Sequence, residues 1–299
     1  MENFQYILPE IFISVSIMLF LLVGVFKKNS ASLIYNLSNI SLVILLALII
    51  NLSSLDTIYL FNESYLIDNL SNYMKIILVG SGIFVMLTGS KYIQVINLNK
   101  IEYPILILSS ILGMMIMISS NDLIVFYMGL ELQSLALYVL ASFNRDNLLS
   151  TESGLKYFVL SALSSGLLLY GCSLTYGFSE STNFDQILIN STEFNYGTTF
   201  GIVFILVGLA FKISAVPFHM WAPDVYQGSP TSVTLFFAIL PKIAALSVFI
   251  KFLYTPFANM NDQWQTIIVF ISIASMIFGA VAAIGQKNLK RLIAYSSIS

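Results

Sequence analysis

The 299-residue chain is apolar at 58% of its positions and charged at only 9%, with a formal net charge of −2. A soluble domain carries about 25% charged residues, because water must solvate its surface, so this composition instead suits a protein that faces lipid. The charge gives no reason to expect nucleic-acid binding. The single cysteine and single histidine exclude a disulfide framework, and they exclude a His/Cys metal or haem site made by this chain alone.

Long apolar runs follow one another along the whole sequence. A helix needs about 20 apolar residues to cross a hydrocarbon core roughly 30 Å thick. We therefore predict an all-α, polytopic transmembrane helical bundle, in which a tenth span begins at Leu292 and is cut off at Ser299. Spans four and five should form an antiparallel hairpin, because the loop between them is very short. The nine complete spans are predicted at 7–26, 33–52, 75–96, 103–119, 123–143, 154–177, 197–216, 233–254 and 264–284.

The N-terminus lacks the features of a targeting segment. Glu2 and Glu10 occupy the region where a signal peptide would carry lysine or arginine, and no small-residue cleavage site follows. An Arg- and Ser-rich transit peptide is not visible either. We therefore expect the first span to stay in the membrane, and the protein to be bacterial or made inside an organelle.

Loops on alternate sides of the membrane differ in charge. Because basic loops remain in the cytoplasm or matrix, the basic side should face inward and the N-terminus outward. Lys75 and Lys251 lie near the acidic side, at span ends where they are expected to snorkel. The basic loops contain Lys27, Lys28, Lys91, Lys100, Arg145, Lys287, Lys290 and Arg291, and the intervening loops contain Asp56, Glu63, Asp68, Asp122, Glu180, Asp185, Glu193 and Asp262.

Three ionisable residues lie deep in apolar spans. Glu131 is about 13 Å into its span at 1.5 Å per residue, Lys242 is at a similar depth from the other side, and Lys212 is deep in the seventh span. Each costs roughly 2.5–3.5 kcal/mol on insertion, so a functional role is the default expectation. Burial favours a neutral lysine and a nearby carboxylate favours a charged one. The three residues therefore suit proton transfer, with a static Glu131–Lys212 ion pair as the alternative.

Prolines accompany both lysines. Pro217 follows Lys212 by five residues and Pro241 directly precedes Lys242. Each removes a backbone hydrogen bond, which membrane proteins tolerate where protein or water satisfies the freed group. We predict a broken helix near residue 217, with a plain packing kink as the alternative. His219 has an unperturbed pKa near 6.5 and is either a proton relay or a hydrogen-bonded packing residue.

Residues 222–231 are predicted to form a rigid turn between the seventh and eighth spans. Asp224 in this turn is expected either to cap a helix or to orient His219. Lys156, near the inner end of the sixth span, is either a snorkelling anchor or a point of proton uptake. Cys172 is interpreted as a packing residue.

Two long motifs resemble a known family. GLELQSLALYVL at 129–140 and KISAVPFHMWAPDVYQGSPT at 212–231 are similar to the antiporter-like membrane subunits of respiratory complex I, a proton-pumping NADH:quinone oxidoreductase. Their residue sequences look like those of the branch called subunit N in bacteria and subunit 2 in mitochondria, and NLKRLIAYSS at 288–297 matches this branch as well. The resemblance covers essentially the whole chain. It implies a bacterial inner membrane or a mitochondrial inner membrane.

The resemblance implies an antiporter-like fold with inverted five-helix repeats. Residues 1–102 would hold three transmembrane helices, 103–254 the first repeat with its broken helix near 217, and 255–299 the start of a second, truncated repeat. Because the chain stops inside that repeat, we expect it to be a fragment. In the family, the positions of Glu131, Lys212 and Lys242 carry a proton route, with His219 as a relay.

The resemblance also implies how the route is driven. Other subunits would carry the FMN, the iron–sulfur clusters and the quinone site, and this chain no cofactor or metal. NADH oxidation and quinone reduction in those partners would power proton translocation from a distance. The expected partners are the other membrane-arm subunits, including antiporter-like paralogues. The competing functions are a Na⁺/H⁺ antiporter subunit and a non-conducting structural subunit of the same complex.

Overall fold

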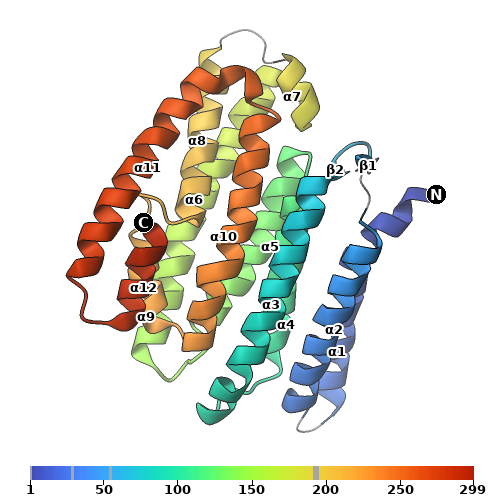
Figure 1. Ribbon diagram of the computed structural model, residues 1–299, viewed down its shortest axis with the longest axis vertical. Helices are drawn as coiled ribbons and strands as arrows, with labels where there is room; N and C mark the ends of the chain where they lie inside the picture. Colours follow the sequence, from blue (N-terminus) through green and yellow to red (C-terminus); the bar gives the residue numbers. More distant parts are fainter. Residues whose placement is uncertain (1, 28–29, 54–55, 191–194) are drawn as a thin grey trace.

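The computed structural model describes residues 2–27, 30–53, 56–190 and 195–299, so the charges predicted at Lys28 and Glu193 lie outside the described residues. Most helices run side by side along the long axis of the molecule, with α1 and α2 at one edge and α11 at the other (Figure 1). The helices are α1 (Leu8–Phe26), α2 (Ala31–Asn51), α3 (Asn69–Val95), α4 (Glu102–Ile118), α5 (Leu123–Ala141), α6 (Leu148–Ser179), α7 (Phe184–Asn190), α8 (Tyr196–Lys212), α9 (Trp221–Gly228), α10 (Thr231–Tyr254), α11 (Asn261–Ile284) and α12 (Leu289–Ile298). Short 3-10 segments occupy Glu2–Ile7 and Ala258–Met260, and the strands are β1 (Ile58–Leu60) and β2 (Tyr65–Ile67).

The helices confirm a multi-pass membrane protein. Within the described residues, seven helices are long and apolar enough to cross a bilayer, and two shorter apolar helices, α4 and α8, have 17 residues each. A length of about 17 residues is the lower limit for a span. These seven and two helices correspond to the nine predicted spans, and the all-helical membrane fold is confirmed.

The connections hold more structure than the sequence suggested. The second loop contains an antiparallel hairpin, in which Ile58 pairs with Ile67 and Leu60 with Tyr65. Its two runs are rich in β-branched and aromatic residues, which favour strands. The outer loop between α6 and α8 contains the two-turn helix α7. Most of the rigid turn predicted at 222–231 is instead helical, because α9 runs from Trp221 to Gly228.

Pro241 does not break its helix. Helix α10 continues through it from Thr231 to Tyr254. A proline leaves the carbonyl four residues earlier without its helical partner, here that of Phe237. The Tyr226 hydroxyl, on α9, donates a hydrogen bond to that carbonyl at 3.2 Å. A side chain from the neighbouring helix therefore satisfies the freed group, and α10 stays continuous beside Lys242.

Helices α4 and α5 approach each other backbone to backbone. A Cβ atom added to Gly113 would lie 2.5 Å from the Gln133 backbone nitrogen, and one added to Gly129 would lie 2.8 Å from the Met117 nitrogen. Small residues permit such close crossings in membranes. The hairpin predicted from the short 120–122 loop is therefore also a close backbone crossing beside Glu131.

We expect Gly129→Ala to destabilise the protein by about 1–3 kcal/mol or more, because overpacking against backbone cannot be relieved by a rotamer change. Gly166→Ala on α6 is the matched control, since a Cβ there would meet nothing within 4 Å. Thermal unfolding of the full-length protein in detergent measures both. Equal stability of the two variants would contradict the crossing described here.

Candidate functional site

Lys212 lies where helix α8 stops. The helix ends at Lys212, Ser214 adopts a left-handed conformation with φ 63°, and helical structure resumes only at Trp221. Carbonyls left open by the break are satisfied locally, because the Ala210 carbonyl accepts from Ala215 N at 2.8 Å and the Trp221 indole donates to the Phe211 carbonyl at 2.9 Å. The lysine thus projects from a helix terminus inside the protein.

Neutral hydroxyl groups surround the Lys212 ammonium. Its Nζ donates to Ser134 Oγ on α5 at 2.7 Å and to Ser161 Oγ on α6 at 2.8 Å, and the residue is only 6% exposed. Ser161 Oγ also accepts from the Tyr138 hydroxyl at 2.6 Å. In the described part of the chain, no carboxylate forms an ion pair with Lys212. The alternative of a static Glu131–Lys212 ion pair is therefore wrong for this conformation.

Glu131 lies next to this hydroxyl cluster without touching the lysine. It is three residues before Ser134 on α5, which places both on one helix face. Its charge acts on the Lys212 ammonium, and its Oε1 is buried with no hydrogen-bond partner among the described residues. The structure therefore brings Glu131 and Lys212 close together. Ser134 lies one helical turn after Glu131 and accepts a hydrogen bond from Lys212.

Lys242 occupies a separate cavity. Its Nζ donates to the Ser297 carbonyl of α12, and the cavity of about 420 Å³ lies between α8, α10, α11 and α12. Ser272 and Ser275 line it, as do Ala210 and Ile213, which lie close to Lys212 in the sequence. One turn of α8 therefore separates the two lysine environments, and the structure does not place Lys242 in contact with Lys212 or Glu131.

His219 lies in the non-helical segment between α8 and α9. It is 8% exposed, its ring centroid is 4.5 Å from that of Phe278 on α11, and its Nδ1 is buried without a hydrogen-bond partner among the described residues. The nearby Val216 N donates to Ser275 Oγ at 2.9 Å, and Ser275 also lines the Lys242 cavity. His219 thus follows closely in the sequence after residues that line the Lys242 cavity, but it contacts neither lysine directly.

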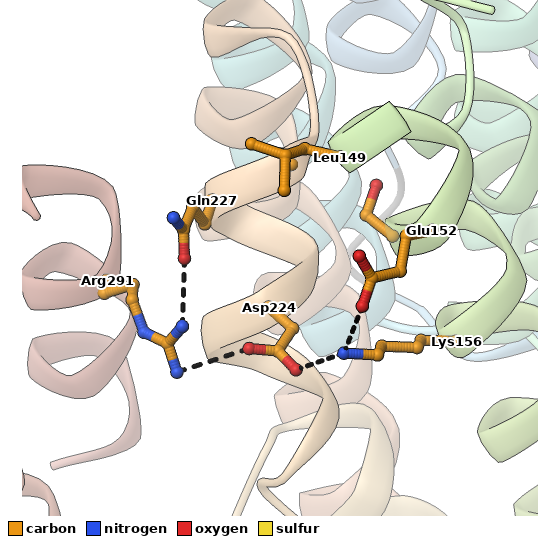
Figure 2. A pocket seen from close by; sticks show the side chains of 8 residues that line it. Leu149, Glu152, Lys156, Asp224, Gln227 and Arg291 are labelled. Carbon is orange, nitrogen blue, oxygen red and sulfur yellow. Dashed lines mark hydrogen bonds and ion pairs between the residues drawn. The ribbon is translucent and has the colours of Figure 1, made fainter. Parts of the chain in front are cut away.

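Asp224 does not orient His219. Figure 2 shows it between two cations, with its carboxylate 2.8 Å from Lys156 Nζ and 3.2 Å from the Arg291 guanidinium. Lys156 also pairs with Glu152 at 2.8 Å, and Arg291 donates to the Gln227 side chain at 2.9 Å. These residues of α6, α9 and α12 line a polar pocket of about 290 Å³, which we call the α6–α9–α12 pocket.

A second buried charge cluster lies outside the predicted site. Lys75 is 3% exposed and pairs with Glu10 at 2.7 Å, and Lys251 is 5% exposed. The expectation that Lys75 and Lys251 snorkel to the surface is therefore wrong, because both side chains turn inward. The signal was available, since Glu10 lies inside the first apolar run, just as Glu131 lies inside the fifth.

Comparison with known proteins gives one consistent relationship. A family model described as "NADH:quinone oxidoreductase/Mrp antiporter, TM" matches residues 120–299. The chain is 70% identical over its full length to NADH-quinone oxidoreductase subunit N of Pelagibacter ubique, covering 63% of that protein. It is 51% identical to subunit N of Rhodospirillum rubrum, with 97% of this chain and 61% of that protein covered. The chain thus spans about three fifths of the length of these relatives.

Solved structures agree in fold. A chain of respiratory complex I from Thermus thermophilus superposes with a TM-score of 0.82 at 29% identity, covering 97% of this chain and 61% of that one. A chain of the Mrp complex from Dietzia gives a TM-score of 0.86 at 18% identity, over 99% of this chain and 57% of that one, which shows the fold alone. Among the described residues, no group of three or more His, Cys, Asp or Glu side chains is placed to hold a metal.

The resemblance to subunit N is confirmed by the identities above. The family match extends over more than half of the chain and includes the segment from Lys212 to Thr231. The chain belongs to the NADH:quinone oxidoreductase/Mrp antiporter family of membrane proteins.

Proposed function

We propose that this chain forms part of the membrane arm of an NADH:quinone oxidoreductase and contributes a transmembrane proton path. The similarity to the subunit N proteins of Pelagibacter ubique and Rhodospirillum rubrum supports this assignment. NADH oxidation and quinone reduction would take place in partner subunits, which would carry FMN, iron–sulfur clusters and quinone. This chain would supply only protonatable side chains, and its neighbours would be other membrane-arm subunits, antiporter-like paralogues among them.

The observation that carries the proposal is the neutral hydroxyl environment of Lys212. A hydroxyl group can both donate and accept a hydrogen bond. Ser134 and Ser161 accept from the ammonium, and by rotating their O–H bonds they can donate to the lone pair of the neutral amine. A permanent carboxylate partner would stabilise only the charged form of the Lys212 side chain. The site therefore stabilises both protonation states, and the nearby charge of Glu131 biases the balance between them.

The remaining parts of the path are arranged on either side of Lys212. The α6–α9–α12 pocket lies at the basic side, which we propose faces the cytoplasm, and its Lys156 is on the same helix as Ser161. Beyond Lys212, the Lys242 cavity begins at Ala210 and Ile213. His219, with its unpartnered Nδ1, would exchange protons near that cavity. We also propose that 103–254 form the first of two inverted five-helix repeats.

Two other functions compete with this one. A Na⁺/H⁺ antiporter subunit would share the fold, but the likeness to the Mrp chain is only 18% in sequence, against 70% for subunit N. A non-conducting structural subunit would need no protonatable group held by neutral hydroxyls. Both observations favour proton translocation in the oxidoreductase.

We expect Glu131→Gln in the full-length protein to slow NADH-driven proton translocation at least about tenfold, since losing 1.4 kcal/mol of charge interaction suffices for that factor. Dye quenching in inverted membrane vesicles measures it, alongside the rate of NADH oxidation. Glu102→Gln, at the exposed start of α4, is the matched control. Normal translocation in Glu131→Gln would favour the structural role, and lost sodium tolerance with intact respiration would favour the antiporter.

A further inference from the structure

Among the described residues, Lys251 is a buried ammonium that contacts no counter-ion. It lies in the last turn of α10 and is 5% exposed, and its Nζ reaches one acceptor, the Ile118 carbonyl at 3.4 Å. No ion pair to it occurs among the described residues. Ile118 ends α4, so two helix C-termini meet the lysine and favour its positive charge. These partial charges do not replace a carboxylate, and an intramembrane lysine in such a place suggests a function.

A charged cluster of three other residues lies beside it. Lys75 on α3 donates to Glu10 Oε1 at 2.7 Å and to the Tyr65 hydroxyl at 3.1 Å, and that hydroxyl donates to Glu10 Oε1 at 2.9 Å. We call these three the Glu10–Tyr65–Lys75 cluster. Strand β2, which contains Tyr65, is bonded to the end of α4 through Leu66 N and the Ser119 carbonyl, next to Ile118.

Lys75 of the cluster and Lys251 lie on neighbouring helices. Helix α10 packs against α3 and α4, and the charge of Lys75 acts on Lys251. The carboxylates of Asp68, which caps α3, and Asp185 on α7 act on it as well, and both residues are half-buried. Helix α7 and the hairpin lie at the same end of the molecule in Figure 1. Lys251 is therefore surrounded at that end by groups of both signs.

Helix α10 carries two lysines at different depths. Lys242 and Lys251 are nine residues apart, about 13 Å along the axis and on opposite faces, since each residue turns the helix by about 100°. Lys242 faces the cavity between α8, α11 and α12, whereas Lys251 faces α3 and α4. The second lysine thus lies between the middle of the bundle and the acidic side.

We propose that Lys251 and the Glu10–Tyr65–Lys75 cluster form an additional proton-binding site, which passes protons from the middle of α10 to the acidic surface at Asp68 and Asp185. The inference rests on the proposed function. A proton binds the lone pair of neutral Lys251 and later leaves to a carboxylate oxygen at that surface. While Lys75 is paired with Glu10 its positive charge is compensated, and when that ion pair opens the Lys75 charge expels the proton from Lys251.

The test replaces Lys251 in the full-length protein within its complex. We expect Lys251→Met to assemble, with a thermal midpoint equal to or above that of the wild type, and to lose proton translocation several-fold. Lys251→Arg should lose it as well, because a guanidinium keeps its proton. Lys91→Met, at the exposed far end of α3, is the control. Vesicle dye quenching and NADH oxidation are read together.

Normal proton translocation in Lys251→Arg would overturn the proposal. It would mean that only a positive charge is needed at the two helix ends, because arginine supplies that charge without releasing a proton. Normal translocation in Lys251→Met would overturn it too. Failure of both Lys251→Met and Lys251→Gln to assemble would also contradict it, since one weak contact should be dispensable for folding. Lys212→Met is measured in parallel: if it also pumps normally, the proposed function itself fails, and if it alone stops pumping, only this inference is lost.

Discussion

Replacing Lys212 with methionine in the full-length protein should abolish NADH-driven proton translocation while leaving the protein assembled. Methionine fills the same space and removes the proton-binding amine. The hydroxyl groups that held the ammonium keep other partners, because Ser134 Oγ donates to the Leu130 carbonyl at 2.6 Å and Ser161 Oγ accepts from Tyr138 at 2.6 Å. The substitution therefore leaves neither serine hydroxyl without a partner, and an unsatisfied buried group is the usual cause of a large loss of stability.

Lys212→Arg separates proton exchange from charge. Arginine retains a positive charge beside Glu131 but does not release its proton in proteins. If Lys212 exchanges protons, Lys212→Arg should be as inactive in translocation as Lys212→Met. If the lysine only anchors helices through its charge, arginine should preserve more activity than methionine. Lys91→Met controls for the loss of a lysine elsewhere, because that side chain is exposed at the end of α3.

The measurement combines two rates in membrane vesicles. Dye quenching reports the protons translocated, and absorbance of NADH reports the electrons delivered. A falling ratio places the defect in this chain's path, whereas a fall in NADH oxidation with an unchanged ratio points to impaired assembly. Assembly with a normal ratio in Lys212→Met would support the structural role and contradict the proposed function.

The membrane spans were predictable because lipid leaves few choices. Backbone groups cannot remain unpaired in hydrocarbon, so each long apolar run must become a helix. Helix α8 shows where this reasoning becomes imprecise, since the apolar pattern continues to Val216 but the helix ends at Lys212. Apolar residues after the break pack as well in an irregular segment as in a helix. The hydropathy of these residues therefore does not show where helix α8 ends.

Connections were harder to predict because their structure depends on tertiary partners. Strand β2 is buried along its length and is hydrogen-bonded to the end of α4. The local sequence pattern does not predict these contacts. Helix α9 contains Pro223 and Gly228, which suggest a turn in isolation, yet its Tyr226 reaches across to the Phe237 carbonyl. Short elements of this kind are held by their neighbours and not by their own propensities.

The candidate site was predictable in its residue types but not in its contacts. An acid or lysine in an apolar span is conspicuous, which identified Glu131, Lys212 and Lys242. Ser134 and Ser161 were not singled out, because serine is common in membrane helices and its role depends on the lysine facing it. Lys251 was assigned to the surface because it lies near a span end, where exposed and buried lysines look alike in sequence.

The buried Glu10–Lys75 ion pair predicts a second large effect. Lys75→Met should lower the free energy of unfolding by about 3–5 kcal/mol, because it leaves the Glu10 carboxylate buried without its counter-ion. The two side chains are 4% and 6% exposed, so water cannot solvate the remaining charge. Among the described residues, Glu10 would keep only the Tyr65 hydroxyl as a hydrogen-bond donor. Thermal unfolding of the full-length protein in detergent measures the loss.

The double variant Glu10→Gln/Lys75→Met should recover most of that loss. A neutral amide has no charge to solvate, and its carbonyl oxygen can still accept from Tyr65, so the combined effect should be smaller than that of Lys75→Met alone. Such non-additivity is expected only of residues that interact directly. Pairing Lys75→Met with Glu102→Gln, on the exposed start of α4, should instead give additive effects. Additivity in the first pair would mean that the two charges do not meet, and the hairpin, α1 and α3 would then be held together by apolar packing alone.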